Sequence, residues 1–265
     1  QDPNLQNIPI RTEQGRAIRS AFLPGPPGWR LMTADYSQIE LRVLAHFSGD
    51  VVMMKAFEED RDIHTQVASE VYSVPLAEVT KAMRRSAKAI NFGVIYGQSP
   101  FGLAKSIDIS KSDAAKFIDA YFAGYPGVDE FMRQTLILCR QQGFVSTISG
   151  RRRPVSGVRD PDSLQDKRQR NLPERIAINT VIQGSAADII KRAMINLHRR
   201  LREAKLQAKM LLQIHDELVF EFPPEEQEQL SKMVVEEMSG AAQLAVPLKI
   251  DVKTGLNWAE CEPIS

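Results

Sequence analysis

The sequence predicts an α+β fold in which a helical subdomain is inserted into an antiparallel sheet. Strand-like segments lie near both ends of the chain, at 29–36, 209–222 and 246–252, whereas residues 50–148 have helical periodicity almost throughout. Strands must pair to satisfy their backbone groups, so these distant segments are expected to meet in one sheet. The chain then leaves the sheet for the helical block and returns to it, which predicts a cleft where it crosses.

The first expected strand, 29–36 (WRLMTADY), ends with the carboxylate of Asp35. A helix is expected to start at Ser37, because the apolar residues that follow share one helical face: Ile39, Val43, Leu44 and Phe47. Ser37 and Glu40 also have the S-x-x-E spacing of a capping box, which favours a helix start here.

The central block predicts several helices of ordinary length. Periodic apolar residues indicate helices at 81–96, 112–122 and 128–142, with stops at Pro75, Gly97, Pro126 and Gly143. A further helix is expected from Glu174 to about Lys205, with a break or kink at Gly184 and Ser185.

The segment 209–222 (KMLLQIHDELVFEF) contains two short apolar runs on either side of His215 and Asp216. This pattern favours two strands joined by a tight turn over a helix. A final amphipathic helix at 225–244 and a last strand at 246–252 complete the expected fold.

The composition is that of an ordinary globular protein of 265 residues, with 43% hydrophobic residues and a net charge of +1. No membrane span or signal peptide is recognisable, so a cytoplasmic protein is expected. Cys139 and Cys261 are far apart and lack a metal-binding spacing, so neither a zinc site nor a disulfide framework is indicated. Residues 150–175 are locally basic, which fits either a solvated loop or contact with a polyanion.

Asp35 and Asp216 are the strongest candidates for metal ligands, because a strand end and a hairpin turn both present side chains at a sheet edge. Two carboxylates held close together repel unless a cation lies between them, and oxygen ligands select a hard ion such as Mg²⁺. Two such ions are the usual arrangement for in-line phosphoryl transfer. The alternative is that each Asp is a turn former or a cap.

Two helical lines of side chains suggest binding surfaces. Arg84, Lys88, Phe92 and Tyr96 recur every four residues, which suits a triphosphate at one end and a base or sugar at the other. Arg175, Asn179 and Gln183 form a polar line that could read minor-groove acceptors. Both lines could instead be structural: an exposed basic face beside core aromatics, and helix-to-helix hydrogen bonding.

Three further residues have two interpretations. Glu40 could merely close a helix start, or its carboxylate could crowd a substrate entering the metal site. His64 and His215 are weaker candidates, because a lone histidine is more often structural than a ligand.

Three segments, DYSQIELRVLAH, RRSAKAINFGVIYG and QIHDELVFE, resemble the three polymerase motifs of family A DNA polymerases, the bacterial DNA polymerase I type, in the order found in that family. The resemblance extends through DPNLQNIPIR, GRRRP, ERIAINTVIQGSAADIIKRAM and VPLKIDV, so it covers nearly the whole chain. It implies a right-hand polymerase with a palm at 1–48 and 170–265 and fingers at 49–169. The thumb and exonuclease domains of the family are not expected in this chain, which would be a fragment with a truncated palm.

The resemblance also implies roles for individual residues. The expected catalytic residues are Asp35, Asp216, Glu217 and Lys88, with Asp35, Asp216 and the backbone carbonyl of Tyr36 as metal ligands. The expected nucleotide-binding residues are Arg84, Lys88, Phe92, Tyr96, His64, Glu40 and Tyr36, with Glu40 as the steric gate against a ribose 2′-OH. The expected DNA-binding residues are Arg11, Arg175, Asn179, Gln183 and His215. Phe at position 92 resembles relatives that discriminate against dideoxynucleotides.

The implied reaction is DNA-templated addition of deoxynucleotides to a primer 3′ end, in replication or repair. Its expected cofactor is a pair of Mg²⁺ ions, for which Mn²⁺ can substitute, and its expected partners are primer-template DNA and deoxynucleoside triphosphates, with no membrane and a monomeric protein. Where many relatives carry a Tyr-Leu-Pro-like stretch, this chain has VSGVRD after GRRRP, which leaves the shape of that loop open.

Three alternatives to this function stay open. One is a nucleic-acid-binding fragment that is inactive without its thumb. The second is a single-subunit RNA polymerase, against which Glu40 argues. The third is a metal-dependent phosphohydrolase, which would leave the line from Arg84 to Tyr96 unused.

Overall fold

A computed structural model describes the chain except residues 1–7, 9–11, 164–168 and 265. The expected DNA contact of Arg11 therefore lies outside the described residues. The chain divides into two compact units, which we call the sheet unit (1–39, 189–243 and 248–265) and the helical unit (40–188 and 244–247). These boundaries fall after residues 39 and 188, whereas the predicted domain boundaries fall after residues 48 and 169.

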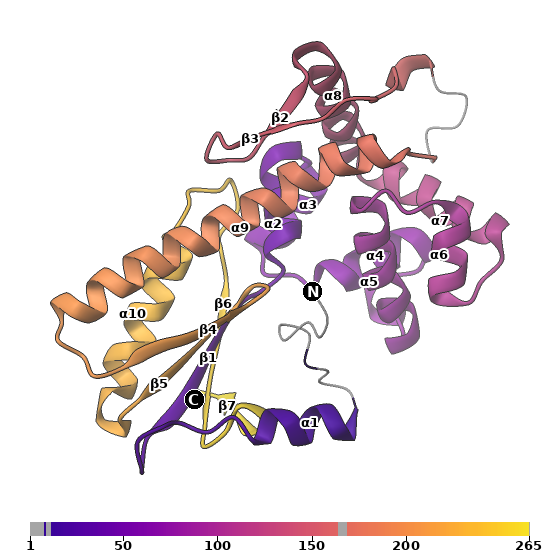
Figure 1. Cartoon of the computed structure of the whole chain (residues 1–265). Helices are drawn as coiled ribbons and strands as arrows, with labels where there is room; N and C mark the ends of the chain where they lie inside the picture. The colour runs from indigo at the N-terminus through magenta and orange to yellow at the C-terminus, as the bar shows by residue number, and fades with distance from the viewer. Residues whose placement is uncertain (1–7, 9–11, 164–168, 265) are drawn as a thin grey trace. The chain divides into compact units, whose positions relative to one another are not determined.

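The sheet unit is built on a five-stranded antiparallel sheet with the order β4-β5-β1-β6-β7 (Figure 1). Its strands are β1 (Arg30–Tyr36), β4 (Lys209–Ile214), β5 (Glu217–Phe222), β6 (Ile250–Gly255) and β7 (Glu262–Pro263). Its helices are α1 (Glu13–Ser20), α10 (Gln227–Ser239) and the second half of α9 (Leu172–Glu203). The predicted α+β fold with an antiparallel sheet is confirmed, and so is the hairpin over 209–222.

Both faces of the sheet contain buried side chains, and on one of them Leu31, Ile214 and Val219 pack with Trp258. On the other face, Met32, Ala34 and Tyr36 of β1 are buried, as are Phe220 and Phe222 of β5. The Tyr36 hydroxyl donates a hydrogen bond to the carbonyl of Met238 on α10 at 2.8 Å. Side chains of a strand alternate between faces, so the residues between these, including Asp35, point to the opposite side.

The helical unit follows the predicted pattern closely. Its elements are α2 (Ile39–Ser48), α3 (Val51–Glu58), α4 (Ile63–Tyr72), α5 (Lys81–Ile95), α6 (Pro100–Ile107), α7 (Lys111–Gly124), α8 (Pro126–Gln142), the hairpin β2 (Phe144–Ser146) with β3 (Arg152–Pro154), and the first half of α9. Five of these helices start at residues whose side chains accept backbone N–H hydrogen bonds: Asp50, Asp62, Thr80, Ser99 and Ser110.

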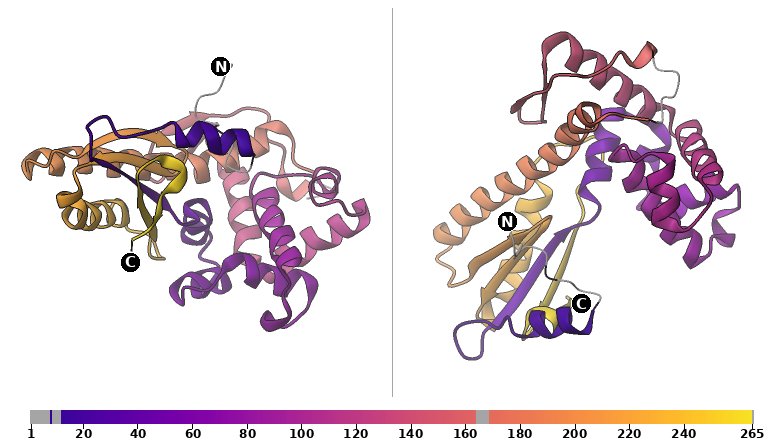
Figure 2. Two further views of the ribbon diagram at one scale, coloured as in Figure 1. Left: turned by 90° about the horizontal axis from the view of Figure 1, so that it is seen from below. Right: turned by 45° about the vertical axis from the view of Figure 1, so that its right-hand side comes forward.

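The predicted break at Gly184 and Ser185 is wrong, because α9 runs unbroken from Leu172 to Glu203 (Figure 2). A Cβ on Gly184 would lie 2.7 Å from Cγ2 of Thr147, so the missing side chain allows close packing. The Ser185 hydroxyl donates to the carbonyl of Val181 and accepts from the N–H of Ile148. These two residues therefore pack α9 against Thr147 and Ile148 without interrupting the helix.

Other differences concern element ends. The strand expected at 246–252 is β6, which begins at Ile250. Pro247 has no N–H to donate to a ladder, and its carbonyl accepts from Arg42 at 2.6 Å. The helix after β1 begins at Ile39, and Gln38 before it has a positive φ of 57°, so the helix starts later than the proposed cap at Ser37. Within the described part of the chain, no helix combines the length and hydrophobicity that crossing a bilayer requires.

Candidate active site

Three carboxylates lie in a row across the sheet unit. Asp35 on the central strand β1 is directly opposite Glu217 on β5 and Asp251 on β6. Directly opposed residues project to the same face of an antiparallel sheet, so all three side chains lie on the face opposite to Met32 and Ala34. Asp251 was not among the sequence candidates, and only its alternation with the apolar residues of 246–252 could have suggested it.

Asp216 joins this row because the turn between β4 and β5 contains only His215 and Asp216. His215 has a left-handed backbone, with φ of 54°. The backbone N–H of Tyr36 donates to the carbonyl of Asp216 at 3.2 Å, which ties the turn to the end of β1. The structure thus brings together Asp35 and Asp216, which are far apart in sequence.

The surroundings of Asp35 disfavour its ionised form. Burial raises the pKa of Asp35 from its ordinary 3.8 to about 7, assisted by the nearby charges of Asp216, Glu217 and Asp251. A hydrogen bond between the Asp35 and Asp216 carboxyls acts in the same direction. Each of these effects disfavours ionised Asp35, and a bound cation would reverse the charge repulsion.

The donor set fits a magnesium ion. Among the described residues, no group of three or more His, Cys, Asp and Glu side chains is arranged as a complete metal site. Mg²⁺ does not need one, because it is usually held by one or two carboxylates with water and substrate phosphates. Asp35, Asp216 and the Tyr36 carbonyl would supply the oxygen donors.

A cleft of about 440 Å³ opens on this carboxylate face. The cations that line it come from α1 and β6, namely Arg16, Arg19 and Lys253. His215 also lines the cleft and is exposed. Neither arginine was predicted, because no helix was recognised at 13–20.

In the helical unit, α5 carries the predicted line of cations and aromatics. Arg84 donates from Nε to Oδ2 of Asp62 at 2.6 Å, and Lys88, one turn further on, is exposed. Asp62 also caps α4 by accepting from the backbone N–H groups of His64 and Thr65. The N-terminus of α4 is therefore linked to the cationic end of α5.

His64 is held as a neutral, buried side chain. Only 3% of it is exposed, and its Nδ1 lies 3.0 Å from the side-chain nitrogen of Asn91, which is fully buried. Burial lowers the pKa of His64 to about 4; the charge of Asp62 opposes this shift, whereas Lys88 and Arg84 add to it. At neutral pH this histidine can thus offer a hydrogen bond but no positive charge.

The aromatic end of the line contacts Glu40. The rings of Phe92 and Tyr96 stack with centroids 6.0 Å apart, and His64 lies 6.1 Å from Phe92. The Tyr96 hydroxyl donates to Oε2 of Glu40 at 2.6 Å. Glu40 and Tyr96 are therefore directly linked, although they lie 56 positions apart in the sequence.

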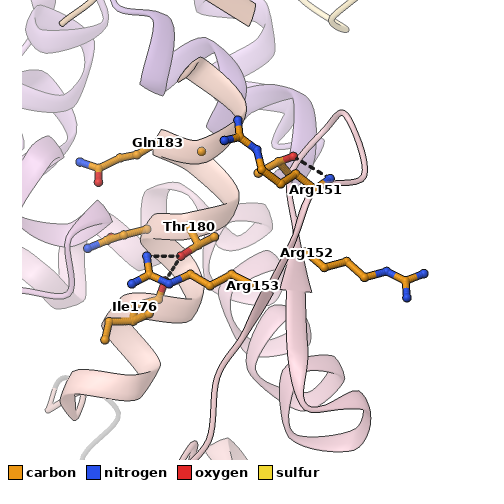
Figure 3. Close-up of a pocket in the computed structure, with 9 residues that line it drawn as sticks. Arg151, Arg152, Arg153, Ile176, Thr180 and Gln183 are labelled. Atoms are coloured by element: carbon orange, nitrogen blue, oxygen red, sulfur yellow. Dashed lines mark hydrogen bonds between the residues drawn. The ribbon is translucent and has the colours of Figure 1, made fainter. Parts of the chain in front are cut away.

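The polar line of α9 borders a basic groove of about 540 Å³ (Figure 3). Asn179 and Gln183 line it together with the hairpin arginines Arg151, Arg152 and Arg153. Arg153 reaches the hydroxyl of Thr180 at 3.2 Å, whereas Arg152 points away from α9 (Figure 3). Arg175 is exposed and lies against Gly97, where a Cβ would come within 2.7 Å of its Cγ.

Comparison with known proteins identifies the family of this chain. The sequence model of DNA polymerase family A matches residues 1–260. The chain is 50% identical to DNA polymerase I of Bacillus caldotenax and 49% identical to DNA polymerase I of Bacillus subtilis, over 261 residues in each case. These alignments cover 98% of this chain but 29% of each relative.

A solved structure is similar as well. The POL domain of Pol1 from M. smegmatis, in complex with DNA primer-template and dNTP, aligns with a TM-score of 0.88 and 46% identity. The alignment covers 97% of this chain and 45% of that one. The chain therefore belongs to DNA polymerase family A.

Proposed function

We propose that this chain carries the polymerase active site and adds deoxynucleotides to a primer 3′ end under the direction of a DNA template. The main observation behind the proposal is the meeting of Asp35, near the end of the central strand β1, with Asp216 in the β4–β5 turn. In this assignment the sheet unit is the palm and the helical unit is the fingers.

The palm carboxylates would bind Mg²⁺ through Asp35, Asp216 and the Tyr36 carbonyl. Two such ions would supply charge neutralisation and an activated attacking oxygen for phosphoryl transfer. Phosphoryl transfer depends mainly on placement and electrostatics, so the remaining residues act by binding and orienting.

The fingers would bind the incoming nucleotide along α5. Arg84 and the exposed Lys88 supply cations for the triphosphate, and Phe92 and Tyr96 supply flat faces for sugar and base. Glu40, fixed by Tyr96, would exclude a ribose 2′-OH by crowding it. His64 would serve as a neutral hydrogen-bonding group beside Phe92.

Each unit would contribute polar groups to nucleic-acid binding. Arg175, Asn179 and Gln183 on α9 and His215 on the palm turn are suited to minor-groove acceptors and the primer end. The arginines of the β2–β3 hairpin fit backbone phosphates. The M. smegmatis relative was solved with primer-template DNA and dNTP, which supports the same partners here.

Primer extension with Mg²⁺ and all four deoxynucleotides tests the proposal. Wild type should extend the primer, and Asp216→Asn should abolish extension while DNA binding, measured by fluorescence anisotropy, is retained. Asp113→Asn is the matched control, because it makes the same change in the first turn of α7, outside the proposed site, and should extend normally. DNA binding without extension by wild type would instead support a binding fragment that needs the rest of the protein.

A further inference from the structure

Glu217 has a hydrogen-bond partner that the proposed mechanism does not use. The indole N–H of Trp258 donates to Oε1 of Glu217 at 3.0 Å. Glu217 follows Asp216 directly and is the cross-strand neighbour of Asp35, so its charge contributes to the raised pKa of Asp35. The orientation of this carboxylate therefore depends on a residue 41 positions further along the chain.

The Trp258 ring is fixed from several directions. It is 5% exposed and packs in a core cluster with Leu31, Ile214 and Val219. Its backbone N–H donates to the carbonyl of Phe22, whose ring meets the indole edge-on at 5.3 Å. An indole held in this way offers its N–H in one direction only, which is the requirement for orienting an acceptor.

The guanidinium of Arg19 lies over a face of the Trp258 indole ring. Its guanidinium carbon is 3.8 Å from the ring centroid, and the side chain is 8% exposed. Its Nε is buried without a hydrogen-bond partner, so contact with the ring and one bond from Nη2 to the Ile8 carbonyl account for its described interactions. A cation on the ring face draws electron density from the indole and strengthens its N–H as a donor.

We propose that Trp258, supported by Arg19, is a positioning residue that holds Glu217 in place beside the metal-binding carboxylates, an inference that rests on the proposed function. Groups that orient the surroundings of a metal typically change metal affinity by about 10- to 100-fold when removed. The N–H of Trp258 would fix the position of the Glu217 charge, and so set the cation affinity of Asp35 and Asp216.

Binding of Mn²⁺ to the 265-residue protein without DNA, followed by electron paramagnetic resonance of the free ion, tests the proposal independently of activity. Trp258→Phe keeps the packing and removes the donor, so it should raise the Kd for Mn²⁺ by about 10-fold. Trp29→Phe is the matched control at the other tryptophan of the chain and should stay within about 2-fold of wild type. In a Glu217→Ala background, Trp258→Phe should have no further effect, because the acceptor is already missing.

Arg19→Met provides a second variant that leaves the N–H in place and keeps a long side chain on the ring. We expect it to raise the Kd for Mn²⁺ by about 3-fold, less than Trp258→Phe does. The proposal is overturned if both variants remain within 2-fold of wild type, or if Trp258→Phe weakens Mn²⁺ binding equally with and without Glu217. Primer extension by wild type distinguishes failure of this proposal from failure of the proposed function. If wild type extends the primer and the variants bind Mn²⁺ as tightly as wild type, only the role of Trp258 is rejected.

Discussion

Replacing Asp35 by Asn should stabilise the metal-free protein at neutral pH while it abolishes polymerisation. Asp35 is crowded by Asp216, Glu217 and Asp251, and its pKa is raised from 3.8 to about 7 by burial and by these neighbours. The folded state therefore binds a proton at Asp35 that the unfolded state releases at lower pH. Asn has the same shape and cannot ionise, so it escapes this cost.

The sign and size of this change in the free energy of unfolding follow from proton linkage. Below pH 3.8 both states are protonated and Asp35 costs nothing, whereas stability is lost as the pH rises through the window from 3.8 to about 7. A shift from 3.8 to about 7 corresponds to about 4 kcal/mol at most, at 1.36 kcal/mol per unit. Because Asp35 is partly exposed and shares its proton with Asp216, a gain of about 1–2 kcal/mol for Asp35→Asn at pH 8 is the realistic expectation.

Urea unfolding in EDTA at pH 4, 6 and 8 measures this gain. The free energies of unfolding of wild type and Asp35→Asn should be nearly equal at pH 4 and differ increasingly toward pH 8. Mg²⁺ should reduce this difference, because it stabilises wild type alone. Asp113→Asn should instead become less stable than wild type toward pH 8, because hydrogen bonds from Ser110 and Lys116 lower the pKa of Asp113. A difference that does not change with pH, or a less stable Asp35→Asn at pH 8 in EDTA, would refute the electrostatic reasoning.

Three further predictions concern the helical unit. Glu174→Gln should lower the free energy of unfolding in urea by about 2 kcal/mol at pH 7, because Glu174 is fully buried and Arg159 bonds both its oxygens. The pKa of Glu174 is lowered although burial acts to raise it, so this loss of stability should shrink as the pH falls below 4.5. A loss that does not change with pH would contradict this reasoning. Asn91→Leu should cost about 1–3 kcal/mol in the same assay by leaving His64 unpaired, and a neutral effect would show that the pair contributes nothing. Gly97→Ala should weaken DNA binding in an anisotropy titration, because a side chain at a φ of 67° is strained and would collide with neighbouring arginine side chains; unchanged affinity would separate this loop from the DNA.

Much of the fold was predictable because local signals agree with the final structure. The hairpin over 209–222 has two apolar runs around a two-residue turn, and α5 was predicted from Lys81 to Tyr96 and observed from Lys81 to Ile95. Motif resemblance pointed to Asp35 and Asp216, but only the strand pairing shows that they meet.

What sequence reasoning missed depends on tertiary contacts. Gly184 was predicted to break a helix, yet it serves close packing against Thr147, which no local pattern reveals. Asp251 and Trp258 have ordinary neighbours in sequence and gain their importance from Asp35 and Glu217. The hydrogen bond between Glu40 and Tyr96 likewise joins residues 56 positions apart.

The two-residue turn at His215 and Asp216 has a consequence for how this gene can vary. One added residue in the turn would move Asp216 away from the N–H of Tyr36, and one added residue in β5 would send the side chains after it to the opposite face of the sheet. Substitutions here can reduce activity by different amounts, whereas any insertion or deletion should destroy the site. In a library of single-codon insertions, no active variant should carry an insertion from Ile214 to Leu218. Insertions in the exposed residues 203–205 before β4 should be tolerated.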